Sequence, residues 1–233
     1  LETDQETPDR VVTDIQRAMA DKDFRENAPR WDEIRSLHVS ESEVERVLLD
    51  KMAHWEVESL LDIGTGTGRM LELLGPRVSR ALGIDRSHEM LSIARANLER
   101  AGLRHCQVRH GDMYQLPLPS ESFDAVTIHQ VLHFADLPAA ALQEAARVLR
   151  PGGILIVIDF APHDREDLRE NHAHRRLGFT EDEVKSWLRG GALEPEEVVH
   201  LPGDPVPVSS WSAPRPAANA RSKRLRRSDH DAA

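Results

Sequence analysis

The chain has 233 residues, enough for one α/β domain with short extensions, and its 39% hydrophobic and 30% charged residues are typical of a globular protein. Its formal net charge of -10 argues against a dedicated nucleic-acid binder, because phosphate recognition needs a basic surface. The single cysteine, Cys106, excludes an internal disulfide, and neither a signal peptide nor a membrane-spanning run is apparent, so we expect a cytoplasmic protein with no membrane partner.

Residues 1–55 are predicted to form an N-terminal helical arm. Within it, a helix is expected from Ser40 to His54, because the apolar residues there recur at helical spacing. These residues are Val44, Val47, Leu48 and Met52. Before this helix, Phe24, Trp31 and Arg35 are candidates for a lid over a ligand, and simple docking of the arm explains them equally well.

Between Glu58 and Asp159, short apolar runs alternate with longer helical periods, a pattern typical of βαβ units. The predicted fold class is therefore α/β, with a Rossmann-like, doubly wound and mainly parallel sheet and helices on both faces. The strands are expected at Ser59 to Ile63, Arg80 to Asp85, Cys106 to His110, Phe123 to Ile128 and Ile154 to Asp159.

Capping and helix-breaking residues mark the helices. Ser87 is suited to begin a helix that Gly102 closes, and Pro151-Gly152-Gly153 is expected to end the helix before the fifth strand. Thr180 and Glu183 have the spacing of a capping box, so another helix should follow them.

The C-terminal part contains two weaker strand candidates, Glu197 to Leu201 and Val206 to Trp211. Pro205 and Pro207 confine the second to a sheet edge or an irregular strand, because proline donates no backbone hydrogen bond. Residues 213–233 are rich in Pro, Ala, Ser and Arg and are predicted to be a disordered basic tail.

A glycine-rich loop follows the first predicted strand. Gly64, Gly66 and Gly68 lack a Cβ, so the backbone and the next helix's N-terminus can approach a polar or anionic ligand closely. The dinucleotide spacing G-x-G-x-x-G would place its third glycine at Arg69 or Leu71, and the Lys-Ser/Thr pair of a P-loop is absent. The loop therefore indicates a different nucleotide-like ligand.

Two carboxylates flank this loop in the predicted fold. Asp62 precedes the first glycine and could attract an ammonium group directly or through water, and Asp85 ends the second strand, where an acid can accept ribose hydroxyls. The pair indicates a ligand with a ribose and a positive charge. Alone, each acid could equally be a structural cap or turn residue.

With these features in place, the chain resembles the class I S-adenosylmethionine-dependent methyltransferases, in the small-molecule type 11 branch that includes ubiquinone and menaquinone C-methylases. The resemblance covers roughly residues 31–193 and assigns a methyltransferase domain to residues 56–212. Its motifs are LLDIGTGTGR, GIDRSHEMLSIARANL, GDMYQLPLPSESFDAV and EAARVLRPGGILIVIDF.

The resemblance implies roles for individual residues in binding S-adenosyl-L-methionine. Gly64, Thr65 and Gly66 would line the methionine and ribose parts, and Asp85 would hold the ribose. His129 would face the methionine end. The residues implied around the adenine are Arg86, Met90, Asp112 and Met113.

A narrower resemblance joins the chain to bacterial fusions of an arsenical-repressor-type winged helix with a methyltransferase. It rests on RENAPRWDEIRSLHV, HQVLHF and DFAPHDREDLRENHAHRRLGF. We nevertheless expect no arsenite methylation, because trivalent arsenic needs several thiolates and the chain has only Cys106.

The expected acceptor side is the crevice at the carboxyl ends of the strands, which gathers His129, His133, Asp159, His163 and Asp164. Methyl transfer mainly requires alignment of the acceptor, and a base only if the acceptor arrives protonated. The catalytic candidates are His129 and His133, followed by His163, and ordinary packing explains each of them as well. We expect no metal, because His172 and His174 would point to different helix faces and no acid accompanies His129 and His133 at fixed spacing.

The sequence therefore predicts methyl transfer to a small organic acceptor. Two alternatives stay open: a cofactor-binding regulatory domain without turnover, and a nucleic-acid methyltransferase that uses the basic tail. A homodimer is also left open.

Overall fold

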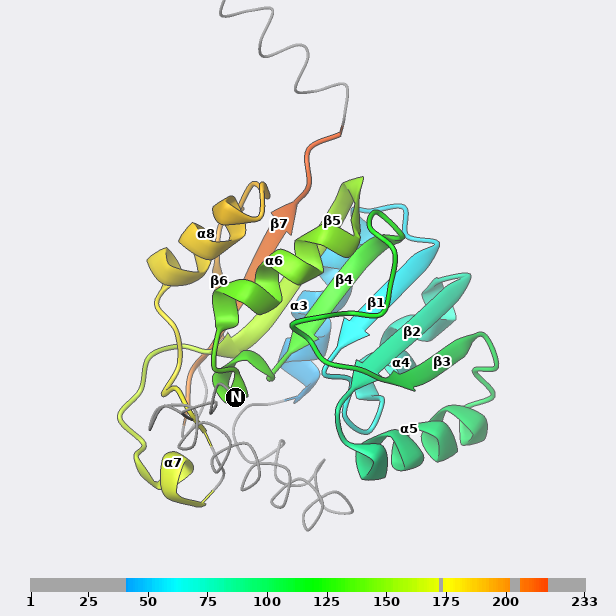
Figure 1. The fold of residues 1–233 in the computed structure, drawn as a ribbon, viewed down its shortest axis with the longest axis horizontal. Coiled ribbons are helices and arrows are strands. Elements are labelled where there is room, and N and C mark those ends of the chain that lie inside the picture. Colours follow the sequence, from blue (N-terminus) through cyan, green and yellow to red (C-terminus); the bar gives the residue numbers. More distant parts are fainter. Residues whose placement is uncertain (1–40, 172–173, 202–205, 218–233) are drawn as a thin grey trace, which may run out of the picture.

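The computed structural model describes residues 41–171, 174–201 and 206–217 (Figure 1). Phe24, Trp31 and Arg35 lie outside these ranges, as does the stretch after Ala217. The lid and the disordered tail therefore stay predictions.

The described strands form one seven-stranded sheet in the order β3-β2-β1-β4-β5-β7-β6. β1 to β5 are parallel, and β7 is antiparallel to both β5 and β6. The mainly parallel, Rossmann-like sheet predicted from the sequence is confirmed. The strands are β1 (Ser59–Ile63), β2 (Arg80–Asp85), β3 (Cys106–His110), β4 (Phe123–His129), β5 (Leu149–Phe160), β6 (Val199–Leu201) and β7 (Val208–Pro214).

Helices cover both faces of the sheet, with α6 and α8 on one face and α3, α4 and α5 on the other (Figure 1). They are α3 (Glu41–Ala53), α4 (Arg69–Leu74), α5 (His88–Arg100), α6 (Pro138–Val148), α7 (Asp167–Asn171) and α8 (Glu181–Gly190), with the 3-10 turns η2 (Gly75–Arg77) and η3 (Leu132–Phe134). Within the described ranges, each helix is too short or too polar to cross a membrane.

The core has two layers because successive residues of a strand point to opposite faces. All five residues of β1 are buried. Leu60 packs with α3, α4 and α5, whereas Leu61 and Ile63 pack with α6 and α8. Helix α3 joins the first layer through the four residues predicted to form its apolar face, Val44, Val47, Leu48 and Met52.

The predicted helix boundaries are largely confirmed. The Ser87 side chain accepts a hydrogen bond from the Met90 N–H at 3.1 Å, and Gly102, just after α5, has a φ of 71°. Thr180 and Glu183 form the complete capping box before α8.

The boundary between α6 and β5 is corrected. The helix ends at Val148, and Leu149 is already extended and buried, so Pro151-Gly152-Gly153 lies inside β5 instead of ending α6. The reason is a long-range contact: the Gly152 N–H donates to the Arg215 carbonyl, and the Arg215 N–H donates to Gly153, both at 2.8 Å. These bonds hold the segment extended.

The end of the chain also differs from prediction. The strand expected at Val206 to Trp211 is an inner strand between β5 and β6, because Pro207 precedes its first paired residue and interrupts no ladder bond. The tail was predicted to begin too early, since Ala213 and Pro214 still pair with Leu155 and Ile154.

Asp124 of β4 connects three strands at their amino ends. Its carboxylate accepts from the Ser59 hydroxyl at 2.6 Å, the Ser59 N–H at 2.9 Å and the Arg150 guanidinium at 2.7 Å. Burial raises the pKa of Asp124, but the hydrogen bonds from Ser59 and Arg150 outweigh burial and lower the pKa below its ordinary value of 3.8.

We expect Asp124→Asn to lower the free energy of unfolding at neutral pH by about 1 to 2 kcal/mol, since the charged acceptor is lost at a partly exposed site. A lowered pKa in the folded state stabilises above the ordinary value, and this contribution disappears as the pH falls through the lowered pKa. Urea unfolding of both proteins should therefore show a difference that shrinks in acid. An equal difference at every pH would contradict this role.

Candidate functional site

The loop after β1 lies where the strand order reverses, because β2 flanks β1 on one side and β4 flanks it on the other. In open α/β sheets, ligands bind outside the carboxyl ends of the strands at such a switch point. Gly64, Gly66 and Gly68 form this loop directly before α4. The topology thus marks the glycine-rich loop as the first place to look for a ligand site.

The loop needs glycine for conformation and for space. Gly64, Gly66 and Gly68 have left-handed φ angles of 71°, 52° and 88°. A Cβ on Gly64 would lie 2.4 Å from a methyl carbon of Val131, far inside normal contact distance. The loop after β1 therefore packs directly against the segment after β4.

Gly83 of β2 is a residue that sequence reasoning missed. A Cβ there would lie 2.6 Å from the Thr65 hydroxyl oxygen, so glycine makes room for that side chain. The only available signal was a glycine inside a strand, which often marks a close approach. The Thr65 hydroxyl is buried and has no hydrogen-bond partner among the described residues, so it is available to a polar ligand.

Asp85 ends β2 beside this loop. One of its carboxylate oxygens accepts from the Gly66 N–H at 2.8 Å and the other from the Ser87 N–H at 2.9 Å. Burial raises the pKa of Asp85, and the backbone hydrogen bonds oppose the shift. A carboxylate has about four lone-pair positions, so these two bonds leave capacity for ligand hydroxyls.

Asp62 lies deeper than Asp85. It is 1% exposed, and one of its oxygens accepts from the Thr127 hydroxyl at 2.7 Å. This position under the loop favours an indirect electrostatic effect on a ligand over direct contact. Its role toward an ammonium group stays a prediction.

The residues expected around the adenine gather at the carboxyl ends of β2 and β3. The Gly111 N–H donates to the Asp85 carbonyl at 3.0 Å, which places Asp112 close to β2. The Asp112 side chain is exposed and accepts from the Tyr114 N–H at 3.0 Å. Met90 is 2% exposed at the start of α5, Met113 is half-buried, and Arg86 is exposed.

The acceptor-side candidates separate into two groups. His129 ends β4 and, by strand alternation, shares the sheet face of Thr127. His133 in η3 is 2% exposed, and its Nδ1 lies 2.8 Å from Asp159 Oδ1 at the end of β5. The structure thus pairs His133 with a fully buried carboxylate.

His163 joins His133 through Phe160, which sequence reasoning did not single out. The Phe160 ring centroid lies 4.8 Å from that of His133 and 5.8 Å from that of His163. His174 completes the cluster, with its ring 4.2 Å from His133 and 5.5 Å from Phe160. Asp164, expected in the same crevice, is exposed.

Metal ligation finds no support in this cluster. Among residues 41–171, 174–201 and 206–217, no group of three or more His, Cys, Asp or Glu side chains could hold an ion. His172 lies outside the described residues.

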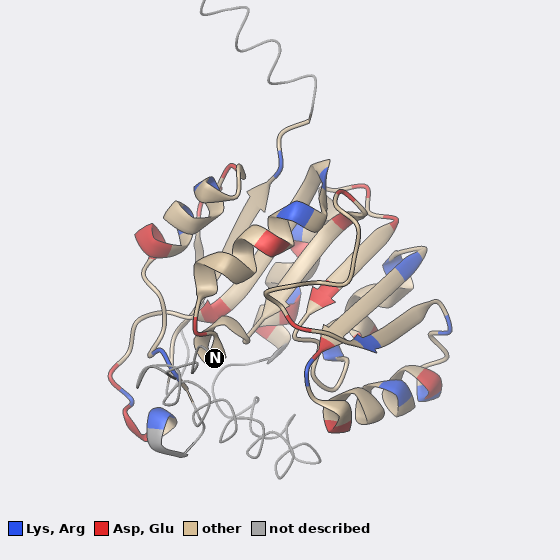
Figure 2. Cartoon of the chain, in the orientation of Figure 1, with Lys and Arg blue, Asp and Glu red and all other residues tan. Residues whose placement is uncertain are grey.

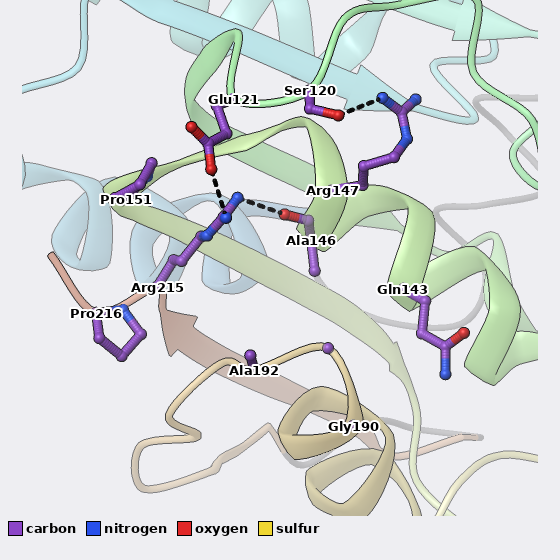
Figure 3. A pocket seen from close by; sticks show the side chains of 11 residues that line it. Ser120, Glu121, Gln143, Ala146, Arg147, Pro151, Gly190, Ala192, Arg215 and Pro216 are labelled. Carbon is purple, nitrogen blue, oxygen red and sulfur yellow. Dashed lines mark hydrogen bonds and ion pairs between the residues drawn. The ribbon is translucent and has the colours of Figure 1, made fainter. Parts of the chain in front are cut away.

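A hollow of about 860 Å³ lies at the opposite end of the parallel strands, near their amino ends. It is bordered by the start of β5, the end of α8 and the end of β7 (Figure 3). Its two cations are already engaged. Arg215 donates to Glu121 and to two backbone carbonyls, and Arg147 donates to Glu144, Ser120 and two backbone carbonyls. Size alone therefore does not make this hollow a ligand site.

Basic and acidic residues are mixed over the described helices (Figure 2). In α5, Glu89 and Glu99 accompany Arg95 and Arg100, and α8 begins with acidic residues and ends with Arg189. Both signs of charge therefore occur along these helices, whereas phosphate-backbone binding uses clustered basic residues.

Comparison with known proteins connects this geometry to a family. Residues 61–157 match the family model described as a methyltransferase domain. An uncharacterized 37.1 kDa protein in transposon TN4556 of Streptomyces fradiae is 42% identical over 63% of this chain and 44% of that protein. Demethylmenaquinone methyltransferase of Thermus thermophilus is 38% identical over 60% of this chain and 64% of that enzyme.

A solved structure shows the same fold. An S-adenosylmethionine-dependent methyltransferase from Aquifex aeolicus superposes with a TM-score of 0.65 at 23% identity, covering 81% of this chain and 97% of that one. The present chain spans less than two thirds of the length of the two curated relatives above.

We expect Asp85→Asn to weaken binding of S-adenosylmethionine by at least about tenfold, because each charge-assisted contact to a hydroxyl is worth roughly 1.5 to 3 kcal/mol. Folding raises the pKa of Asp85 above its ordinary value of 3.8. Ionisation of Asp85 therefore lowers the free energy of unfolding as the pH rises from 3.8 to the raised pKa. In the variant without ligand, relief of this cost is offset by the loss of an acceptor for the N–H of Gly66 or Ser87, so the melting temperature should change little at neutral pH. Calorimetry measures the affinity and thermal melts measure the stability. Asp112→Ala is expected to lose less affinity than Asp85→Asn. Unchanged affinity in Asp85→Asn would exclude a ribose role.

Gly64→Ala should destabilise the chain by about 1 to 3 kcal/mol more than Gly102→Ala. Both glycines have a φ of 71°, but a Cβ on Gly102 meets nothing within 4 Å, whereas one on Gly64 meets Val131. The matched control thus removes the backbone strain of about 1 to 2 kcal/mol that both variants share. Equal losses in urea unfolding would show that the Val131 contact is unimportant.

Proposed function

We propose that this chain, whose residues 61–157 form a class I S-adenosylmethionine-dependent methyltransferase domain, transfers a methyl group from that cofactor to a small organic acceptor. The observation that carries the proposal is Asp85, a carboxylate with spare acceptor capacity beside a glycine loop at the switch point of the sheet. The buried, unpartnered hydroxyl of Thr65 in the same loop also fits a polar ligand.

In this proposal, S-adenosylmethionine supplies an electrophilic methyl group on a sulfonium. Gly64, Thr65 and Gly66 line its methionine and ribose parts, Asp85 accepts the ribose hydroxyls, and His129 faces the methionine end. Asp62 acts from beneath the loop on the positive charge. The residues assigned around the adenine are Arg86, Met90, Asp112 and Met113.

The chain's main catalytic task is to align the acceptor and exclude water, because the displacement at the methyl carbon must be in line. His129, His133 and His163 are the candidates for positioning the acceptor or taking its proton. A small organic acceptor is supported by the relative named demethylmenaquinone methyltransferase. Cytoplasmic location and dimer formation remain predictions.

A cofactor-binding regulatory domain is the second candidate. Such a domain would bind S-adenosylmethionine without turnover. The mixed charges of the described helices disfavour the third candidate, a nucleic-acid methyltransferase.

Calorimetry should detect binding of S-adenosylmethionine and S-adenosylhomocysteine with micromolar-scale affinity, the range usual for enzyme substrates. A methyl-release assay over hydroxyl, thiol, amine and carbon acceptors should then find turnover, and filter binding to bulk RNA and DNA should find no affinity. Failure of a folded sample to bind either cofactor form would refute the central proposal. Binding without turnover would favour the regulatory domain, and salt-sensitive RNA binding would favour the third candidate.

A further inference from the structure

The hydrogen bonds of His133 fix the position of its proton. Asp159 is fully buried, and its oxygens accept from the Leu132 N–H at 2.9 Å and the Phe160 N–H at 2.8 Å as well as from His133. Because the carboxylate acts as acceptor in all these contacts, His133 Nδ1 must be the donor. In the neutral ring, His133 Nε2 then carries the lone pair.

His163 has the opposite arrangement. Its Nδ1 accepts from the Arg165 N–H at 3.2 Å, so the proton of the neutral ring is on Nε2. Burial is the main cause that lowers the pKa of His163, and the neighbouring Arg165 adds to it, which favours the neutral ring near pH 7. Its Nε2 is buried and has no partner among the described residues. An unmatched buried donor is unfavourable, and a ligand acceptor would satisfy it.

The rings of His133 and His163 both contact one aromatic residue, and the segment that carries His133 packs against the glycine loop. Phe160 contacts both, with ring centroids 4.8 Å from His133 and 5.8 Å from His163. Val131, two residues before His133, packs against Gly64. A basic nitrogen, a neutral N–H donor and an aromatic face therefore occur together beside the loop assigned to the cofactor.

We propose that His133 and His163 select an acceptor with an ionisable hydroxyl on an aromatic or enolic carbon, with His133 Nε2 removing the proton and His163 Nε2–H binding the oxygen. This inference rests on the proposed methyl transfer. The O–H bond breaks and its proton passes to His133. The oxygen lone pair forms the new bond to the methyl carbon, the electron pair of the broken C–S bond stays on sulfur, and the imidazolium later returns its proton to water.

The ionisation state of different acceptors favours a hydroxyl. A phenol with a pKa near 10 is ionised to roughly one part in a thousand at neutral pH, so a base can contribute about 4 kcal/mol. A thiol with a pKa near 8.5 gains much less from a base. An ammonium would gain as much from a base as a phenol does, but it has no lone pair to accept from the His163 N–H. It would instead need a carboxylate, and both oxygens of Asp159 are already engaged.

Asp159 is then a positioning residue, since it acts only through His133. Nitrogen NMR of the imidazoles tests this without any ligand. We expect His133 with its proton on Nδ1 and His163 with its proton on Nε2, and a mixed or reversed tautomer for His133 in Asp159→Asn. The reverse assignment for either histidine in the parent protein would overturn the proposal.

Turnover tests the chemistry. Methyl transfer would be measured for a panel of phenols and naphthols against matched thiols and amines, and for para-nitrophenol, which is already largely ionised near neutral pH. His133→Gln should lower kcat/KM for unsubstituted phenols by roughly 100-fold or more, and by much less for para-nitrophenol. His163→Phe should weaken both reactions, because the hydroxyl oxygen loses its donor.

Calorimetry with S-adenosylhomocysteine separates failure of the hydroxyl-acceptor proposal from failure of the cofactor assignment. Both histidine variants should bind it as tightly as the parent, and thermal melts should confirm that they are folded. A parent protein that binds the cofactor but methylates only thiols or amines, or no hydroxyl in the panel, would overturn this inference and leave the cofactor assignment intact. Equal losses for phenol and para-nitrophenol in folded His133→Gln would exclude the base role. Loss of cofactor binding in the parent would instead refute the proposed function.

Discussion

The burial of β1 on all sides is the constraint on which the structure depends. β2 and β4 pair with its two edges, and helices cover both faces, so none of its residues reaches solvent. At the carboxyl end of β1 the chain must turn sharply out of the buried sheet, and it does so through glycines in left-handed conformations. The glycine loop is therefore a consequence of the central strand, and its packing against Val131 joins the segments that follow β1 and β4.

Asp85 shows how the fold holds a carboxylate ready for a ligand. Burial disfavours its charge, while the N–H groups of Gly66 and Ser87 compensate in part. The same two bonds fix the loop and the start of α5 before any ligand arrives. Ligand hydroxyls would add hydrogen bonds to a group whose charge is only partly compensated.

The sequence predicts what local chemistry determines. The bounds of β1, β2 and β3 and the capping box of α8 follow from patterns within a few residues. The start of β5 and the inner position of β7 depend on pairing between residues 149–160 and 208–214, which no local pattern encodes. In the candidate site, Asp85 stood out because it ends a predictable strand. The contact between Gly83 and Thr65 and the assembly around Phe160 were not predictable, because each joins segments that meet only in the folded chain.

The two ends of the parallel strands differ in how many of their polar groups have hydrogen-bond partners. At the amino ends, beside the hollow, Arg147 and Arg215 already donate to carboxylates and carbonyls, so a ligand there would have to displace existing bonds. At the carboxyl ends, the Thr65 hydroxyl and His163 Nε2 are buried without partners among the described residues. Ser210 and Trp211 share this property, but they lie within β7. Unmatched polar groups beside the glycine loop support a ligand site there more directly than cavity size does at the other end of the strands, because a bound polar group would satisfy them.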